Sequence, residues 1–137
     1  MKIAVDFDGT IVEHRYPEIG KEIPFATQTL RMLLADGHKL ILWSVREGRL
    51  LEEAIQWCKQ RGVYFYAVNQ DFEGDTPMKN PDFSRKLKAD LFIDDRNIGG
   101  LPEWGVIYEL ISRRMRYADY LEQQAKDVTK KKSWWKL

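Results

Sequence analysis

The chain has 137 residues, of which 44% are hydrophobic and 31% are charged. That length supports one compact domain and leaves too little sequence for two. The 22 Lys and Arg residues nearly balance the 21 Asp and Glu residues, so the formal net charge is only +1. This balance disfavours proteins that hold nucleic acid or anionic lipid through bulk charge.

The cysteine content and the apolar runs exclude further classes. Cys58 is the single cysteine, so an intramolecular disulfide is excluded, and no Cys/His spacing typical of a zinc site occurs. No apolar run approaches the ~20 residues that span a bilayer, and the N-terminus lacks the apolar stretch of a signal peptide. We therefore expect a cytoplasmic protein that makes no contact with membranes.

Short apolar runs alternate with segments of helical spacing along the first 112 residues. Helices are predicted over 24–35 and over 49–61, each closed by a glycine. The runs that predict strands are 3–5, 39–44, 63–68, 90–94 and 106–108. This alternation predicts an α/β fold, a Rossmann-like three-layer sandwich around a mostly parallel five-stranded sheet.

Two segments depart from this alternation. Residues 69–84 are rich in Asp, Gly, Pro and Asn, and such a long polar connection is typical of an active-site loop. After Ser112 a helical pattern leads into a basic tail that carries Trp134 and Trp135. The predicted organisation is an α/β core over 1–112, followed by a C-terminal helix and tail over 113–137.

Three of the predicted strands end in chemically useful residues. Asp6 and Asp8 follow the first strand, Ser44 follows the second, and Asp94 and Asp95 follow the fourth. In open α/β sheets ligands bind beyond the carboxyl ends of the strands, so these groups are expected to converge. Residues two apart in an extended chain face the same side, which predicts that the two carboxylates after the first strand lie together.

Clustered carboxylates repel one another unless a cation neutralises them. Three or four of them at one site therefore favour a hard divalent metal bound through oxygen. The chain offers little imidazole or thiolate for softer metals. Mg2+ is the predicted cofactor.

The residues at these strand ends resemble three motifs of one enzyme superfamily. The run DFDGT from Asp6 to Thr10 resembles the first motif of the haloacid dehalogenase (HAD) superfamily of aspartyl-phosphate enzymes. Ser44 resembles its second motif, a Ser or Thr at a strand end. The pair Asp94 and Asp95 resembles its fourth motif. The resemblance covers roughly residues 1–112.

The third HAD motif is a lysine, and the sequence offers several candidates for it. The stretch 86–95 is similar to the lysine-to-acid-pair segment of many bacterial members, which favours Lys86. Lys88 and Lys79 remain open as alternatives.

The resemblance implies a role for each acidic residue. Asp6 would be the nucleophile that forms an aspartyl-phosphate, and Asp8 would be the general acid and base. Mg2+ would be held by Asp6, by the backbone carbonyl of Asp8 and by Asp95, with Asp94 in an outer position. Contacts to the phosphate are assigned to Gly9, Thr10, Ser44, Arg46 and Lys86.

The spacing of the motifs leaves no room for the cap domain that many HAD enzymes carry. One helix and loops fill the space between the motifs, so a flap over 12–23 is the candidate cover of the site. Since the cap usually selects the substrate, the resemblance implies only a phosphorylated small molecule. The missing cap and the tryptophan-bearing tail both favour self-association.

The sequence therefore predicts a Mg2+-dependent, capless phosphomonoester hydrolase of the HAD type. Two alternatives with the same chemistry are a phosphotransferase and a polynucleotide-end phosphatase, the latter weakened by the near-neutral charge. A third alternative is a non-catalytic phosphate- or metal-binding module, or a receiver-like protein that accepts a phosphoryl group.

Overall fold

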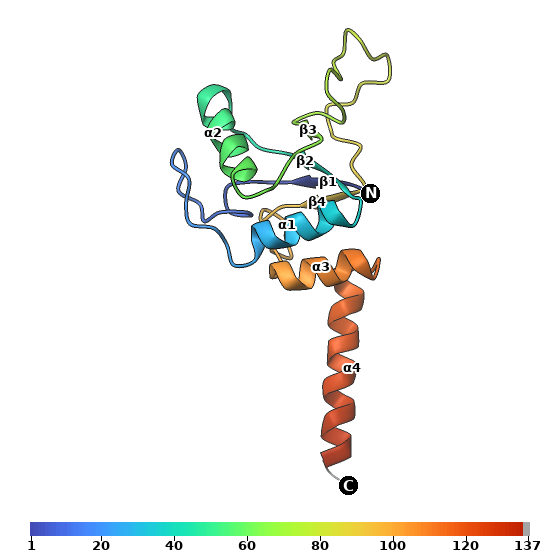
Figure 1. The fold of residues 1–137 in the computed structure, drawn as a ribbon. Coiled ribbons are helices and arrows are strands. Elements are labelled where there is room, and N and C mark those ends of the chain that lie inside the picture. The colour runs from blue at the N-terminus through green and yellow to red at the C-terminus, as the bar shows by residue number, and fades with distance from the viewer. Residues whose placement is uncertain (136–137) are drawn as a thin grey trace. The chain divides into compact units, whose positions relative to one another are not determined.

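Four short parallel strands form the sheet of this computed structural model, which describes residues 1–135 (Figure 1). Their order is β3-β2-β1-β4, so β1 lies between β2 and β4. Val5, the last residue of β1, is in register with Leu42 of β2 and Ile93 of β4. The strands are β1 (Lys2–Val5), β2 (Lys39–Leu42), β3 (Ala67–Val68) and β4 (Leu91–Ile93).

The chain divides into two compact units, Met1–Pro102 and Glu103–Leu137. The first unit contains the sheet and two crossover helices, and the second contains two helices. The helices are α1 (Ala26–Ala35), α2 (Gly48–Lys59), α3 (Trp104–Ser112) and α4 (Tyr117–Trp135). Residues 136 and 137 of the predicted tail lie outside the described residues. None of the described helices is long and apolar enough to cross a membrane.

The two inner strands supply the core of the first unit. The side chains of Ile3 and Val5 and those of the apolar residues of β2 are fully buried, and the side chain of Ala4 is almost fully buried. A strand that pairs on both sides and is covered on both faces has a continuous apolar sequence, and β1 and β2 show this pattern. The buried inner strands fix in place the residues that follow them.

Both predicted crossover helices are present, although their ends differ by up to two residues from the predicted ranges 24–35 and 49–61. In α1 the buried residues Ala26, Leu30 and Leu33 follow a four-three spacing. α2 ends in a left-handed turn at Gly62, whose φ is +77°. The N–H groups of Gly62 and Val63 donate to the carbonyls of Lys59 and Cys58, which closes the helix.

The five-stranded sheet predicted from the sequence is wrong, because residues 106–108 belong to α3 rather than to a strand. The buried residues of this segment are Trp104, Ile107 and Ile111, a three-four spacing that fits a helix face. A run of three apolar residues is too short to separate a strand from a buried helix. The observed sheet is all parallel with four strands, and the fold is a small α/β fold of broadly Rossmann-like type.

The third strand is shorter than predicted. The sequence suggested 63–68, whereas only Ala67–Val68 is a strand. Tyr64 and Tyr66 are exposed, although the N–H of Tyr66 still donates to the carbonyl of Leu40. β3 is an edge strand, so half of its backbone groups lack a neighbouring strand and pairing is easily lost along it.

Candidate functional site

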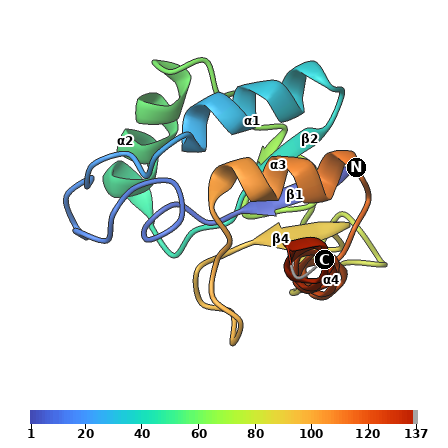
Figure 2. The ribbon, with the colours of Figure 1, turned by 90° about the horizontal axis from the view of Figure 1, so that it is seen from below.

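Asp6 stands at the carboxyl end of the central strand. The sheet ladder continues past Val5, because the N–H of Asp6 donates to the carbonyl of Ile93 and the N–H of Trp43 donates to the carbonyl of Val5. The arrowheads of β1 and β4 point the same way in Figure 2, so the residues after both strands meet at one edge. The backbone of Asp6 is thereby held from both sides.

Three carboxylates meet at this edge, and we call them the acidic cluster: Asp6, Asp94 and Asp95. One carboxylate oxygen of each lies within 4.8 Å of the others. Asp94 and Asp95 follow β4 directly, and the N–H of Arg96 turns back to an Asp94 oxygen at 2.9 Å. The sequence-based expectation that the strand ends bring these acids together is confirmed for these three.

The buried hydroxyl of Thr10 ties two members of the acidic cluster together. Its Oγ1 lies 3.1 Å from an Asp6 oxygen and 3.2 Å from an Asp95 oxygen. It also accepts a hydrogen bond from the N–H of Asp95. In this structure Thr10 therefore orients the carboxylates, whereas its predicted contact with phosphate stays a prediction.

Burial and acidic neighbours make Asp6 hard to ionise. Its pKa is raised from 3.8 to about 7, first by burial, then by the hydrogen bond with Asp95 and by the charge of Asp94. Partial burial disfavours the charged form, and two nearby carboxyls add repulsion. A divalent cation would offset both effects. Three carboxylates with only oxygen donors fit a hard ion such as Mg2+ or Ca2+.

Gly9 brings the backbone close to the acidic cluster. Its φ is +85°, and a Cβ at this position would collide with the Asp95 carboxylate. The N–H of Gly9 donates to the carbonyl of Val12 at 2.8 Å, so the chain turns sharply just after Asp8. Only glycine satisfies both the left-handed conformation and the close approach.

We expect Gly9→Ala to destabilise the fold by about 2–4 kcal/mol, because it adds a steric clash to an unfavourable backbone conformation. Gly37→Ala is the matched control, since Gly37 has φ +91° and open space where a Cβ would stand. It should cost only the conformational part, about 1 kcal/mol. Urea unfolding of both variants measures the difference, and equal losses would show that the approach to Asp95 is not tight.

The Asp8 side chain lies with Arg46 rather than in the acidic cluster. The Nε and Nη2 atoms of Arg46 contact the two Asp8 oxygens at 2.7 and 2.8 Å. The Arg46 side chain is fully buried and that of Asp8 is only 9% exposed. The hydrogen bonds to Asp8 raise the pKa of Arg46 above its usual value. The expected pairing of the Asp6 and Asp8 carboxylates assumed an extended chain, whereas the chain turns after β1.

Every N–H of the Arg46 guanidinium is engaged. Besides the two bonds to Asp8, it donates to the carbonyls of Pro17, Glu18 and Leu50 at 3.2, 2.9 and 3.4 Å. The guanidinium carbon also lies 5.3 Å from the Phe7 ring centre and 5.2 Å from that of Tyr16. Arg46 has no donor left for a phosphate in this arrangement.

The segment predicted as a flap forms an arm beyond the carboxyl ends of the strands, drawn in blue in both views (Figure 1; Figure 2). Its two sides pair antiparallel, with a bridge between Val12 and Glu22. The N–H of Glu13 also donates to the carbonyl of Lys21 at 2.8 Å. Because Arg46 binds the carbonyls at the tip of this arm, it links the arm to Asp8.

Ser44 lies after β2 in a small polar network. Its N–H donates to the side-chain oxygen of Asn69 at 2.8 Å, and its hydroxyl accepts a hydrogen bond from the N–H of Arg46 at 3.1 Å. Asn69 follows β3 in a left-handed conformation. Asn69 was not predicted as a site residue, although it directly follows an apolar run, as Asp6 and Ser44 do.

None of the contacts described for the candidate lysines is with the acidic cluster. Lys86 Nζ is 6.0 Å from the ring centre of Phe92. Lys88 donates through Nζ to the carbonyl of Asp82 and through its N–H to the Asp71 carboxylate. Lys79 is exposed. Which of the three acts in the site stays a prediction.

The polar loop predicted to serve the site extends to the other end of the sheet. The carbonyl of Asp71 accepts a hydrogen bond from Lys2, the first residue of β1. Asp90, which precedes β4, also contacts the N–H of Lys2. The segment between them forms the yellow-green excursion in Figure 1. Beyond Asn69, which is bonded to Ser44, the described contacts of this loop with the strands are therefore at their amino ends.

Comparison with known proteins gives one informative match. No family model and no curated protein matches this chain. A solved structure, described as a conserved protein from Bacteroides thetaiotaomicron, is 63% identical. The match covers 88% of this chain and 96% of that chain, with a TM-score of 0.81. This chain belongs to the family of that conserved Bacteroides protein.

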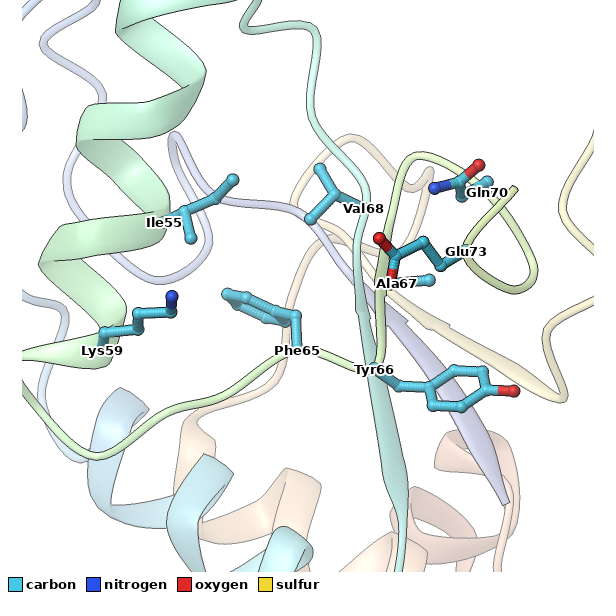
Figure 3. A pocket seen from close by; sticks show the side chains of 8 residues that line it. All are labelled: Ile55, Lys59, Phe65, Tyr66, Ala67, Val68, Gln70 and Glu73. Carbon is cyan, nitrogen blue, oxygen red and sulfur yellow. The ribbon is translucent and has the colours of Figure 1, made fainter. Parts of the chain in front are cut away.

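Besides the acidic cluster, this family member has a cavity of about 310 Å³ beside the edge strand. Ile55 and Lys59 of α2 face Phe65 across it, and Glu73 lies on the other side of β3 (Figure 3). β2 separates this edge strand from β1. The cavity and the acidic cluster are thus distinct features of the first unit.

Proposed function

We propose that this chain is a Mg2+-dependent phosphomonoester hydrolase of the HAD type that acts on a phosphorylated small molecule. The observation that carries the proposal is the acidic cluster, in which Asp6 ends the central strand beside Asp94 and Asp95. The sequence resemblance to the HAD motifs supplies the roles. The buried single thiol of Cys58 suits a reducing compartment, and we propose the cytoplasm as its location.

The carboxylates of Asp6, Asp94 and Asp95 and the backbone carbonyl of Asp8 are the proposed holders of Mg2+. A bound divalent ion would neutralise the acidic cluster and offset its repulsion toward a phosphate dianion. Oxygen-only ligation of this kind matches the preference of Mg2+.

The proposed reaction has two steps. In the first, an Asp6 oxygen attacks phosphorus, the bond from phosphorus to the ester oxygen breaks, and the leaving oxygen takes a proton from Asp8. In the second, Asp8 removes a proton from water, whose oxygen attacks the phosphorus of the aspartyl-phosphate. The bond from phosphorus to Asp6 then breaks, which releases inorganic phosphate and restores both carboxyl groups.

The contact with Arg46 bears on the proposed role of Asp8. Both Asp8 oxygens accept hydrogen bonds from Arg46 in this structure. To protonate a leaving oxygen, Asp8 must give up at least one of them. Because Arg46 also binds the arm carbonyls of Pro17 and Glu18, movement of the arm would change the position of Asp8.

The residues that would hold the phosphoryl oxygens are supported less directly. Ser44 lies at the end of β2, where its hydroxyl already accepts a hydrogen bond and has its own proton free to donate. We propose that this proton is donated to a phosphoryl oxygen. A positive charge from Lys86, Lys88 or Lys79 would complete the phosphate contacts.

Release of inorganic phosphate from a panel of small phosphomonoesters tests the proposal. We expect turnover with Mg2+ and none above the uncatalysed rate with a chelator. The order of the substrates in the panel would narrow the substrate class. Absence of turnover over the whole panel, with Mg2+ bound, would contradict a small-molecule hydrolase.

A non-catalytic metal- or phosphate-binding module is the second candidate. It is favoured by the engagement of both Asp8 oxygens by a buried arginine, which leaves the general acid unavailable in this arrangement. Such a module would bind Mg2+ and inorganic phosphate but release no phosphate from any ester. The same panel, with binding measured by calorimetry, separates the two functions.

The raised pKa of Asp6 predicts how Mg2+ affinity depends on pH. Below its pKa of about 7 Asp6 is protonated, and Mg2+ must displace that proton in order to bind. Affinity is therefore expected to rise about tenfold per pH unit between pH 5 and 7 and to level off above pH 7. Calorimetric titration across this range measures the slope. A flat profile would contradict Asp6 as a ligand.

A further inference from the structure

The cavity of about 310 Å³ beside β3 is formed entirely by residues of the first unit. Its walls come from α2, from residues 65–68 around the edge strand and from the start of the polar loop (Figure 3). Sites for small molecules commonly have volumes of about 300–1,000 Å³. The cavity lies at the lower end of this range, so we expect a small ligand rather than a dinucleotide or a large cofactor.

One part of the cavity is apolar. Ile55 of α2 faces the ring of Phe65, and Val68 points toward the same space (Figure 3). All three side chains are partly exposed to solvent. An apolar group placed between Ile55 and Phe65 would remove apolar surface of both from water, which is favourable. The cavity therefore favours a ligand with an apolar side chain.

The outer backbone edge of β3 borders the cavity. β3 is the edge strand of the sheet and pairs only with β2, through Ala67 and Val68. An edge strand therefore presents backbone N–H and C=O groups that have no partner in a neighbouring strand. A peptide bond supplies both the acceptor and the donor that such an edge lacks, and extended peptides bind sheet edges in this way. The edge favours a ligand that contains a peptide bond.

Opposite charges lie on two sides of the cavity. Lys59, the last residue of α2, extends its ammonium group toward Phe65, and the Glu73 carboxylate lies on the side of the polar loop (Figure 3). Lys59 and Glu73 are exposed, and neither takes part in an ion pair within the first unit. A ligand with a carboxylate at one end and an ammonium group at the other would satisfy both charges.

We propose that this cavity binds a dipeptide that has free termini and apolar side chains. The carboxylate of the dipeptide would contact Lys59 and its ammonium group would contact Glu73. Its peptide bond would lie along the outer edge of β3, with one side chain between Ile55 and Phe65. β2 separates the edge strand from β1, which carries the candidate site, and the inference does not depend on the proposed hydrolase activity.

Other small ligands match the cavity less well. A free amino acid carries its carboxylate and its ammonium group on one carbon atom, whereas the charges of Lys59 and Glu73 stand on different sides of the cavity. A nucleotide or inorganic phosphate would be attracted by Lys59 but repelled by Glu73. An internal segment of a larger protein has no free terminus for either residue.

Titration of the full chain with leucyl-leucine, followed by two-dimensional NMR, is the first test. For a ligand of this size we expect a dissociation constant on the order of 0.1–1 mM. The backbone amide resonances of residues 65–70 and 55–59 should shift and saturate, whereas those of residues 94 and 95 should stay unchanged. Saturable shifts confined to other residues, or no shift up to about 10 mM peptide, would overturn the proposal.

Paired changes in protein and ligand test the two charge contacts. Lys59→Met should weaken the binding of leucyl-leucine about three- to fivefold, and leucyl-leucine amide, which lacks the carboxylate, should bind the native chain equally weakly. The two ligands should bind Lys59→Met alike, because the contact is already lost. Glu73→Gln and N-acetyl-leucyl-leucine form the corresponding pair for the ammonium group. Ligand changes that have the same effect on the native chain and on the variants would overturn the proposed contacts.

Arg49→Met and Asp36→Asn are the matched controls for these variants. Each removes one exposed charge, of the same sign as that of Lys59 or Glu73, from a residue that does not line the cavity. Both controls should bind leucyl-leucine as the native chain does. All four positions are exposed, so none of the variants is expected to unfold.

Changes to the peptide itself test the class of ligand. Methylation of the peptide nitrogen removes the N–H that would pair with β3 and should weaken binding about fivefold. Leucine alone should bind more weakly than leucyl-leucine, and equal affinity would show that the peptide bond is not recognised. Leucyl-leucine that is both acetylated and amidated imitates an internal segment of a protein. If it bound as tightly as leucyl-leucine, the partner would be a protein chain and the proposal would be wrong.

Discussion

Asp6→Asn should abolish Mg2+-dependent phosphate release, with a loss of at least about a thousandfold, and should stabilise the metal-free fold at pH 8. The activity falls because an amide cannot form the phosphoryl bond that Asp6 would form. The stability rises because the substitution removes a charge that burial and two acidic neighbours disfavour. A residue kept for packing alone would not change the two properties in opposite directions.

The pH dependence of stability gives the sign of this effect. The pKa of Asp6 is raised from 3.8 to about 7, so between these values the folded chain binds more protons than the unfolded chain. The metal-free native protein should therefore lose stability as the pH rises from 4 to 7. The Asp6→Asn variant should lose less stability over this range. Above pH 7 it should be about 1 kcal/mol more stable than the native protein, a value reduced to allow for screening by solvent.

Urea unfolding in chelator, together with phosphate release in Mg2+, measures both properties. Asp36→Asn is the control, because Asp36 is exposed at the end of α1, near the amino end of β2. It should leave activity unchanged. Full activity of Asp6→Asn would overturn the proposed mechanism, and a large loss of stability would contradict the repulsion inferred for the acidic cluster.

The acidic cluster was predictable from the sequence because parallel strands impose it. Once 3–5 and 90–94 are recognised as neighbouring parallel strands, their carboxyl ends must lie at one edge. Asp6, Asp94 and Asp95 then converge whatever the rest of the fold does. Asn69 was accessible by the same rule, since it follows β3.

The partner of Asp8 could not be predicted from the sequence. Arg46 lies 38 residues further along the chain, and a fully buried arginine is rare, so its charge suggested a phosphate contact. Its burial depends on the arm, whose Pro17 and Glu18 carbonyls accept two of its hydrogen bonds. The carbonyl of Leu50 in α2 accepts a third. No local sequence pattern specifies where those carbonyls point.

The errors in the fold have a related cause. The run 106–108 is short, and a short apolar run fits a strand and a buried helix equally well. The run 63–68 lies at the edge of the sheet, where pairing is easily lost. Pairing with β2 limits β3 to Ala67–Val68, and the spacing of Trp104, Ile107 and Ile111 makes the second run a helix. Tertiary neighbours, rather than local propensity, decided both segments.

Arg46→Met is expected to destabilise the fold by about 3–5 kcal/mol, because it leaves the nearly buried Asp8 carboxylate without its counter-ion. It also removes the hydrogen bonds to the carbonyls of Pro17, Glu18 and Leu50. Methionine keeps an unbranched apolar stem between Phe7 and Tyr16, so the loss measures the guanidinium rather than a large cavity. The total stability of such domains is only about 5–15 kcal/mol, so the effect should be large.

Arg49→Met is the matched control for this substitution. Arg49 forms an exposed ion pair with Glu53 one turn along α2, and loss of such a pair should cost at most about 0.5 kcal/mol. The loss of stability in Arg46→Lys should lie between those of Arg46→Met and Arg49→Met, because one ammonium cannot replace five donors spread over Asp8, the arm and Leu50. If Arg46→Met does not fold, the stability of Arg46→Lys can still be compared with that of Arg49→Met.

The arm gives a second readout that is independent of both global stability and enzymatic activity. Arg15 and Lys21 are exposed on the arm, and trypsin cuts there only when the arm opens. Arg46→Lys should be cut at these sites at least about tenfold faster than the native chain, whereas Arg49→Met should match it. A double-mutant cycle with Asp8→Asn should show coupling above about 1.5 kcal/mol. Unchanged cleavage of Arg46→Lys would show that Arg46 does not hold the arm, and additive losses would show that its contact with Asp8 contributes nothing to stability.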